Sequence, residues 1–221
     1  MFLCLFFMDK ISRTMEILGK RYPRSTTTLN TMRGEASAFE ILISCLLSLR
    51  ARDEVTDVVS RDLFAVANTP EAIVGLDDAE LKRIIFRSGH FNKKAVALKS
   101  VSQDLIERFD SRVPESYEEL ISIKHVGPKT ANIVLAFAFD KLVIPVDVHC
   151  HRIPNRLGWI ETKTPEETEV RLMEILPKRY WREFNSAFVQ FGRETCLPVS
   201  PRCSECPVAG FCDRVGVIRS R

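Results

Sequence analysis

The stretch that decides the fold runs from Ile121 to Asp147 and reads ISIKHVGPKTANIVLAFAFDKLVIPVD. It predicts a helix over Ser116–Ile123, a turn over Lys124–Gly127 and a second helix over Pro128–Phe139, because proline favours the first position of a helix. A glycine turn before a helix start points backbone amides outward, where they can bind phosphate without reading a base. Two lysines beside the turn add positive charge. An ordinary helical hairpin with solvated lysines would look the same, so this stretch alone leaves two interpretations open.

Apolar and aromatic patterns elsewhere also predict helices. Ala38–Leu49 is apolar nearly all round, which is typical of a helix buried on most sides. Aromatic residues recur at helical spacing over Phe184–Phe191, which indicates a core face, and Gly192 is the expected end of that helix. Further helix starts with capping residues are expected at Thr69–Pro70, Ser116–Glu119 and Thr164–Glu167.

Strand signals are scarce in this sequence. Leu142–Val148 is rich in β-branched residues, but Pro145 interrupts the run and favours an extended connector over a sheet strand. We therefore predict an all-α fold in two lobes, with the chain crossing from one lobe to the other near Asp140–Lys141.

The composition places the chain among globular proteins. Of 221 residues, 45% are hydrophobic and 28% are charged, which excludes a disordered chain, a collagen-like repeat and a disulfide-stapled miniprotein. Lys and Arg number 32 against 29 Asp and Glu, so the formal net charge is +3. This small excess neither requires nor excludes a polyanionic partner, because a local basic patch can exist without a basic total.

The chain opens with an apolar run, Met1–Met8, that reads MFLCLFFM. It lacks the basic segment and the small-residue cleavage site of a secretory signal, and it is far shorter than the roughly 20 residues that span a bilayer. We expect residues 1–7 to be disordered or wrongly assigned, with Met8 as the functional start. No other apolar stretch reaches membrane length without a charge, so we expect a soluble, cytoplasmic protein with no membrane partner.

Four of the seven cysteines form a cluster in the sequence, Cys196-x6-Cys203-x2-Cys206-x5-Cys212. A disulfide pair is disfavoured in a reducing cell interior. Zinc accepts four thiolates, but its modules more often use two short knuckles, and here only one spacing is short. A 4Fe–4S cluster is larger and tolerates uneven loops, so spacing favours iron–sulfur over zinc. The bystanders are Cys4, Cys45 and Cys150.

The segment Ile123–Ala131, which reads IKHVGPKTA, resembles the helix-hairpin-helix of the endonuclease III family of DNA glycosylases, whose usual pattern is LPGVGRKTA. Val146–His149 is similar to that family's Val-Asp-Thr-His, and the cysteine spacing matches its iron–sulfur loop. Ser48–Asp53 is similar to the segment after its first barrel helix, and Gly89–Ala95 resembles its second DNA-facing loop. The resemblance covers about residues 9 to 215 in one consistent order.

The resemblance implies a two-lobed helix-hairpin-helix fold. A six-helix barrel domain would hold residues 31–141, and residues 1–30 with 142–221 would form a discontinuous domain around the cluster. Double-stranded DNA with a damaged base or an abasic site would lie across the cleft between the lobes, with the damaged nucleotide flipped out of the duplex. The expected protein is a monomer on the nucleoid of a prokaryotic cell.

The same resemblance implies catalytic roles for Lys129 and Asp147. Lys129 matches the family's nucleophile, and only an amine that attacks the sugar C1′ can leave a Schiff base for β-elimination. Asp147 matches the carboxylate that would stabilise positive charge on the sugar and assist proton transfer. The mismatch branches carry serine or tyrosine in place of this lysine. The expected activity is therefore that of a bifunctional glycosylase and abasic-site lyase for oxidised pyrimidines such as thymine glycol.

Further residues carry over as candidate DNA contacts. Arg50 and His90 stand where the family fills the gap left by the flipped nucleotide, often with glutamine and leucine. His125 stands at a turn position where the family has glycine, which indicates strain or a different turn. The remaining candidates are Lys124, Val126, Gly127 and Thr130 of the hairpin, and His149 and Arg152 after the aspartate. Basic residues beside these turns, which would offer charge to phosphate, also include Arg52, Lys93 and Lys94.

Two other functions stay open at this point. A monofunctional mismatch or uracil glycosylase would use water, with Asp147 as the base and Lys129 as a phosphate contact. A non-catalytic DNA-binding module would need only the hairpin, since backbone binding requires no carboxylate.

Overall fold

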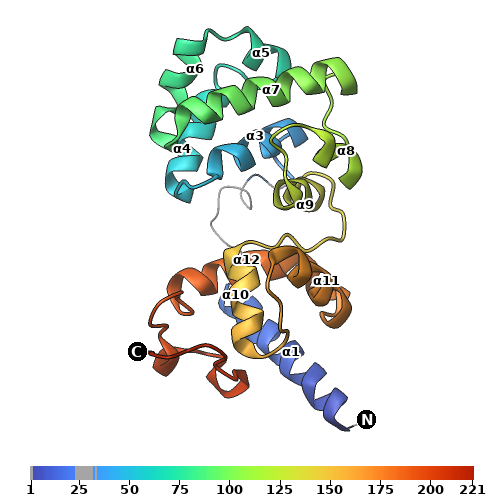
Figure 1. The fold of residues 1–221 in the computed structure, drawn as a ribbon, viewed down its shortest axis with the longest axis vertical. Helices are drawn as coiled ribbons and strands as arrows, with labels where there is room; N and C mark the ends of the chain where they lie inside the picture. Colours follow the sequence, from blue (N-terminus) through green and yellow to red (C-terminus); the bar gives the residue numbers. More distant parts are fainter. Residues whose placement is uncertain (1, 23–31, 33) are drawn as a thin grey trace. The chain divides into compact units, whose positions relative to one another are not determined.

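The computed structural model describes residues 2–22, 32 and 34–221. Throughout these residues the regular structure is helical and no strand occurs, as the sequence predicted (Figure 1). The chain divides into two compact units. The first takes its residues from the ranges 1–25 and 142–221, and the second from the range 26–141.

The second unit is built from seven α-helices among its described residues. They are α3 (Ala38–Ser48), α4 (Asp53–Phe64), α5 (Pro70–Gly75), α6 (Asp78–Ile85), α7 (Phe91–Phe109), α8 (Tyr117–Ser122) and α9 (Pro128–Phe137), with a short 3-10 helix, η1 (Phe86–Ser88), before α7. Helix α3 packs against α4, α7 and α9, and α7 also packs along α5 and α6 (Figure 1). The continuous burial of α3 from Ile41 to Leu47 explains why its sequence is apolar nearly all round.

Capping residues start the helices where the sequence predicted. The Thr69 and Ser116 hydroxyls accept hydrogen bonds from the amides of Ala72 and Glu119, at 3.2 and 3.3 Å. These contacts satisfy amide donors that a helix start leaves free. The hairpin's second helix ends two residues earlier than expected, because Asp140 adopts a left-handed conformation, with φ of 52°.

The first unit joins the two ends of the chain. Its helices are α1 (Phe2–Arg21), α10 (Val148–Leu157), α11 (Pro165–Ile175) and α12 (Trp181–Glu194), with short 3-10 helices η2 (Lys178–Tyr180), η3 (Cys203–Glu205) and η4 (Ala209–Phe211). Helix α1 lies against α12, far from it in the sequence (Figure 1). Ile11, Met15 and Leu18 of α1 are fully buried in one core with the phenylalanines of α12. The aromatic pattern of α12 is thus a core face, as predicted.

Two expectations for this unit differ from the structure. Residues 1–7 were expected to be disordered or wrongly assigned, and disorder differs from the structure, in which α1 begins at Phe2 and Phe7 packs against the buried core. Gly192 was expected to end α12, but the helix continues to Glu194. A Cβ at Gly192 would lie 2.3 Å from Nδ1 of His149, so the glycine permits close packing rather than a helix stop.

The segment from 142 to 147 has no regular secondary structure and matches the predicted connector. Ile144 and Val146 are 0% and 5% exposed and anchor it in the core of the first unit. No helix in the described part of the chain is long and apolar enough to cross a membrane.

Candidate functional site

The hairpin of α8 and α9 is joined by a tight turn over residues 123–126. The amide of Val126 donates to the carbonyl of Ile123 at 3.1 Å, and His125 at the third turn position has a φ of 72°. This is the geometry of a type II turn, whose third position favours glycine because it needs a positive φ. His125 therefore occupies the strained conformation that its replacement of glycine indicated.

Lys129 is the second residue of α9, directly after the turn, and its side chain is exposed. Gly127 precedes the helix as its N-cap, and Pro128 takes the first helical position. Burial raises the pKa of the Cys45 thiol on α3 to about 12, and the Lys129 ammonium partly offsets this rise. The Lys129 amine thus stands at a helix start, and its charge interacts electrostatically with the buried Cys45 thiol of α3.

The other hairpin candidates divide by exposure. Lys124, His125 and Gly127 are exposed, whereas Val126 and Thr130 are 5% and 6% exposed. The Val126 amide is already used inside the turn. The exposed edge of the hairpin therefore consists of one basic side chain, the strained histidine and the backbone before α9, a combination suited to a phosphate rather than to base reading.

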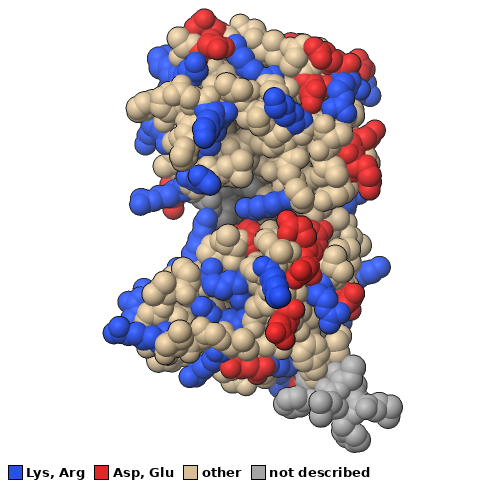
Figure 2. All heavy atoms as spheres, viewed as in Figure 1, with Lys and Arg blue, Asp and Glu red and all other residues tan. Residues whose placement is uncertain are grey.

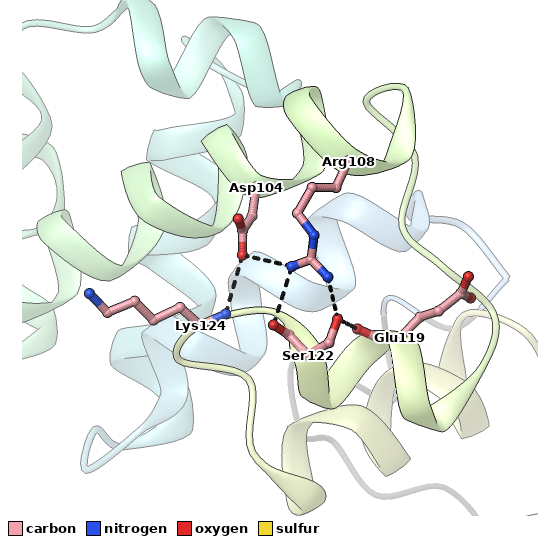
Figure 3. Close-up of polar contacts among 5 residues, drawn as sticks. All are labelled: Asp104, Arg108, Glu119, Ser122 and Lys124. Atoms are coloured by element: carbon pink, nitrogen blue, oxygen red, sulfur yellow. Dashed lines mark hydrogen bonds and ion pairs between the residues drawn. The ribbon is translucent and has the colours of Figure 1, made fainter.

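A polar network on α7 holds this turn in place (Figure 3). The Asp104 carboxylate accepts the backbone amide of Lys124 at 3.3 Å and pairs with Arg108 Nη1 at 3.3 Å. Arg108 donates to the carbonyl of Ser122 at 3.2 Å and to its hydroxyl at 2.6 Å. These bonds satisfy a carbonyl at the end of α8 and fix the second residue of the turn, Lys124. The spacing of Asp104 and Arg108 was the only sequence signal of this network.

Arg50 and His90 stand in two further turns of the second unit, and both side chains are exposed. Arg50 has a φ of 55° and follows Leu49 at φ −57° and ψ 116°, and the amide of Ala51 donates to the carbonyl of Ser48 at 3.0 Å. The Arg50 turn is therefore also of type II. His90 has a φ of 48° and immediately precedes α7. Left-handed non-glycine residues are uncommon and concentrate at functional sites.

Lys94 does not offer charge to phosphate, contrary to the sequence-based prediction. Its side chain is 6% exposed, and Nζ donates to two backbone carbonyls of the protein. Lys93, the residue before it, is exposed. Two adjacent lysines on a helix point in different directions. Helical spacing places Lys94, and not Lys93, on the same face as the buried Leu98 and Val101.

Asp147 caps the start of α10 in the first unit. Its Oδ1 accepts the backbone amides of His149 and Cys150 at 2.9 and 2.8 Å. These two bonds fix the orientation of a half-buried carboxylate. The aspartate of the Val146–His149 motif, Asp147, is therefore also the N-cap of α10.

His149 and Arg152 point along α10 toward protein partners. Nη2 of Arg152 lies 3.2 Å from His149 Nδ1 and donates to the carbonyl of Cys196 at 2.9 Å. Burial lowers the pKa of the Arg152 guanidinium. One turn later, Arg156 donates to Cys196 Sγ at 3.4 Å and to the carbonyl of Leu197 at 2.8 Å. Sequence reasoning missed Arg156, whose spacing of four residues from Arg152 was the available signal.

The four cysteines predicted as ligands line one cavity of the first unit. They are Cys196, Cys203, Cys206 and Cys212. Leu157, Phe191 and Val217 supply apolar walls, and Arg156 and Arg202 supply positive charge. A group of four thiolates carries negative charge, so guanidinium groups beside it are electrostatically favourable. Cys45 and Cys150 lie away from this cavity, buried among apolar residues.

The arrangement of these thiols fits an iron–sulfur cluster. The four cysteines surround one cavity, and a multi-iron cluster is large enough to bond their sulfur atoms around its edge. Burial raises the pKa of the Cys206 and Cys212 thiols, and the neighbouring cysteines add to the rise. A cationic centre bonded to these sulfur atoms would favour their thiolate form.

Positive and negative charges are mixed on the face of the molecule drawn in Figure 2, where Lys and Arg occur in both units with Asp and Glu among them. On this face the distribution of charge does not by itself indicate a binding surface. The individual turns described above carry that information.

Comparisons with known proteins agree with this geometry. The family model of HhH-GPD superfamily base excision DNA repair proteins matches residues 43–178, and that of the iron-sulfur binding domain of endonuclease III matches residues 196–212. Endonuclease III of Thermotoga maritima is 43% identical over 194 residues, which cover 88% of each chain. A solved non-covalent endonuclease III–DNA complex has a TM-score of 0.85 at 30% identity, covering 94% of this chain and 95% of that one. A trapped endonuclease III–DNA covalent intermediate has a TM-score of 0.84 at 30% identity, covering 94% and 96%.

Proposed function

This chain belongs to the endonuclease III family of HhH-GPD superfamily base excision DNA repair proteins, and from that membership we propose that it excises damaged bases from DNA and cleaves the abasic site that remains. It is a DNA glycosylase with abasic-site lyase activity that carries a 4Fe–4S cluster. The observation that carries the lyase step is the exposed Lys129 amine at the start of α9. A structural relative forms a trapped covalent intermediate with DNA, which supports an amine as the attacking group.

Lys129 is the proposed nucleophile. Its deprotonated Nζ attacks C1′ of the damaged nucleotide, the bond from C1′ to the base breaks, and the base leaves with the bonding electron pair. Ring opening gives an imine between Nζ and C1′. A base removes a proton from C2′, the 3′ phosphate leaves, and water then hydrolyses the imine to release the amine. The amine must lose a proton before it attacks, because only the neutral amine has a free electron pair for the new bond.

Asp147 is the proposed partner of this amine in the chemistry. Its carboxylate would stabilise positive charge on the sugar while the base departs, and would relay protons during imine formation. The two α10 amides hold Oδ1. A carboxylate that is oriented before the reaction loses little entropy in the transition state.

The hairpin and the two strained turns are the proposed DNA contacts. Lys124 and the backbone before α9 would bind phosphate, which positions the duplex without reading its sequence. Arg50 and His90 would enter the gap left by the flipped nucleotide. Arginine can donate hydrogen bonds to the orphaned base, and histidine can stack on its neighbours. His149 and Arg152 contact DNA in this proposal only through the backbone near them, because their side chains have protein partners.

The four cysteines of the loop would hold the 4Fe–4S cluster. When bound, the cluster supplies four strong bonds to a segment with little apolar core of its own. Arg156 holds the first cysteine from the side of α10 through its contacts to Cys196 and Leu197. The cluster loop and the Asp147 cap are thus attached to one helix.

Oxidised pyrimidines such as thymine glycol are the proposed substrates, together with abasic sites. The lysine at position 129 supports this choice, since it permits strand cleavage after base loss. We further propose that the protein acts as a monomer on the nucleoid DNA of a prokaryotic cell, by analogy with its bacterial relative.

Borohydride trapping tests the Lys129 assignment. Reduction of the imine should give a stable protein–DNA adduct with a thymine glycol duplex, and Lys129→Gln should abolish it. Lys124→Gln removes the same charge from the same hairpin and should weaken binding while it keeps the adduct. Persistent trapping by Lys129→Gln would overturn the assignment. Base release without any adduct in the unsubstituted protein would instead indicate a monofunctional, water-using glycosylase.

A further inference from the structure

Lys94 lies in the first turn of α7 and is the buried lysine of the second unit. Its Nζ donates to the carbonyl of Leu47 at 2.6 Å and to the carbonyl of Ser88 at 2.7 Å. Burial lowers the pKa of this ammonium to about 8. Burial of a lysine ammonium costs free energy, and the two hydrogen bonds to carbonyls offset part of that cost.

The two carbonyls that Lys94 binds stand at corresponding places. Leu47 lies in the last turn of α3, directly before the turn that carries Arg50. Ser88 ends η1, directly before Gly89 and His90. The last carbonyls of a helix have no partner within the helix and need a donor from elsewhere. A single ammonium therefore caps two helices and joins the two turns that follow them.

The two turns carry residues in a strained left-handed backbone conformation, so contacts from neighbouring elements are needed to hold them. Arg50 and His90 are exposed and have φ values of 55° and 48°. Such conformations persist only where the surrounding structure determines them. Ser88 is itself held, because its hydroxyl donates to the carbonyl of Ile85 at 2.7 Å.

We propose that Lys94 is a positioning residue that holds the Arg50 turn and the His90 turn in one fixed relation, and thereby sets the preference of the protein for damaged over undamaged DNA. The inference rests on the proposed function, in which Arg50 and His90 fill the gap beside the flipped nucleotide. A second role as an attacking amine is excluded by geometry. Nζ of Lys94 is enclosed and bonded to two carbonyls, whereas Lys129 is exposed.

Lys99 provides a matched control on the same helix. Its Nζ donates to the carbonyl of Leu76 at 2.7 Å and pairs with Asp78 at 2.6 Å. It thus supports the connection between α5 and α6 and does not touch either strained turn. Lys99→Met removes a lysine from α7 and a bond to a carbonyl, as Lys94→Met does, and should cost stability for the same reason.

The experiment compares binding of two duplexes that differ by one non-cleavable abasic analogue. At a temperature where circular dichroism shows every variant folded, Lys94→Met should lose about tenfold of the preference for the analogue duplex, since two buried acceptors lose their donor. Lys99→Met should keep the preference. If Lys94→Met does not fold, Lys94→Gln, which keeps an amide donor in the pocket, is measured in its place and should lose part of the preference.

A mutant cycle tests whether Lys94 changes the preference for damaged DNA through Arg50 and His90. If Lys94 acts through the two turns, Lys94→Met should have little further effect once Arg50 and His90 are both alanine, because coupled residues are not additive. Additive losses, an equal loss on both duplexes, or an unchanged preference would each overturn the proposal. Failure of the unsubstituted protein to prefer or to nick damaged DNA would instead reject the proposed function itself.

Discussion

His125 holds a backbone conformation that disfavours an L-amino acid side chain. Its φ of 72° costs about 1–2 kcal/mol relative to the right-handed region. Glycine removes that cost but loses roughly 0.5–1 kcal/mol of chain entropy on folding. We therefore predict that His125→Gly raises the free energy of unfolding by up to about 1 kcal/mol in urea denaturation, and keeps or raises affinity for an abasic-analogue duplex.

Asp110→Gly is the control for this prediction. Asp110 ends α7 with a φ of 52° and offers the same relief of strain away from the hairpin. It should raise stability and cause no loss of DNA affinity, because removal of a negative charge does not weaken attraction to phosphate. A large loss of DNA affinity in His125→Gly would show that the histidine makes a contact of its own with DNA.

Sequence motifs single out individual residues where the chemistry requires one residue type. Lys129, Asp147 and the four cysteines of the cluster follow from patterns of that kind, and their roles stay predictions. Lys94 shows how far such reasoning reaches. Its spacing from Leu98 and Val101 places it on the buried face of α7. The sequence does not show which carbonyls it binds there, because the packing of α3 and η1 around it supplies them.

Helix α7 is the element that supports the turns of the second unit. Its first turn binds the ends of α3 and η1 through Lys94, and its later turns bind the end of α8 through Asp104 and Arg108. Among the left-handed residues of this unit, Arg50, His90 and His125 lie in turns that are held by contacts to this helix or by the chain entering it. Its 19 residues offer enough length to do so.

Arg108→Met tests the part of this support that serves the hairpin (Figure 3). The variant loses the bonds to the Ser122 carbonyl and hydroxyl. Each such bond contributes about 1 kcal/mol net, and Arg108 is 41% exposed, so we expect a roughly 3–10-fold weaker affinity for the abasic-analogue duplex. Fluorescence anisotropy measures it.

Arg112→Met is the matched control, because Arg112 is an exposed arginine three residues after α7. It removes the same charge, so general attraction to DNA falls equally in both variants. Equal affinities for the two variants would show that the network with Ser122 does not position the hairpin.

Helix starts and the hairpin could be predicted because capping residues and proline act locally. The continuation of α12 through Gly192 could not, since the reason lies 43 positions earlier in the sequence, in the ring of His149. Glycine has two uses, a positive φ and a close approach, and sequence alone does not separate them.

At the scale of the whole molecule, the first unit is assembled from both ends of the chain. The core that holds Ile11 and Met15 of α1 also holds Cys196 and Val208, and Cys206 and Cys212 pack against its edge. The order of elements in the sequence does not show that residues near 11 and near 206 share a core. The family resemblance implied it through the expected discontinuous domain, and composition or periodicity did not.

Removal of one proposed cluster ligand should therefore weaken the whole first unit, including α1. Cys206→Ala leaves three of the four proposed ligands for the 4Fe–4S cluster and opens the edge of this core. We predict loss of bound iron and of the broad visible absorption of the cluster. We also predict a fall in Tm by roughly 5 °C or more, since about 1 kcal/mol shifts a protein of this size by 2–4 °C.

Cys150→Ala separates loss of the cluster from loss of a buried cysteine. Cys150 is 0% exposed in the same core, and its Sγ lies 3.6 Å from Nδ2 of Asn185, away from the cavity. This variant should lose stability through the cavity that it creates but keep its iron and its colour. Full iron content in Cys206→Ala, or iron loss in Cys150→Ala, would contradict the division of the cysteines into ligands and bystanders. If the division holds, proteolysis should release fragments of α1 sooner in Cys206→Ala than in Cys150→Ala, because the core that buries α1 is the one that the cluster completes.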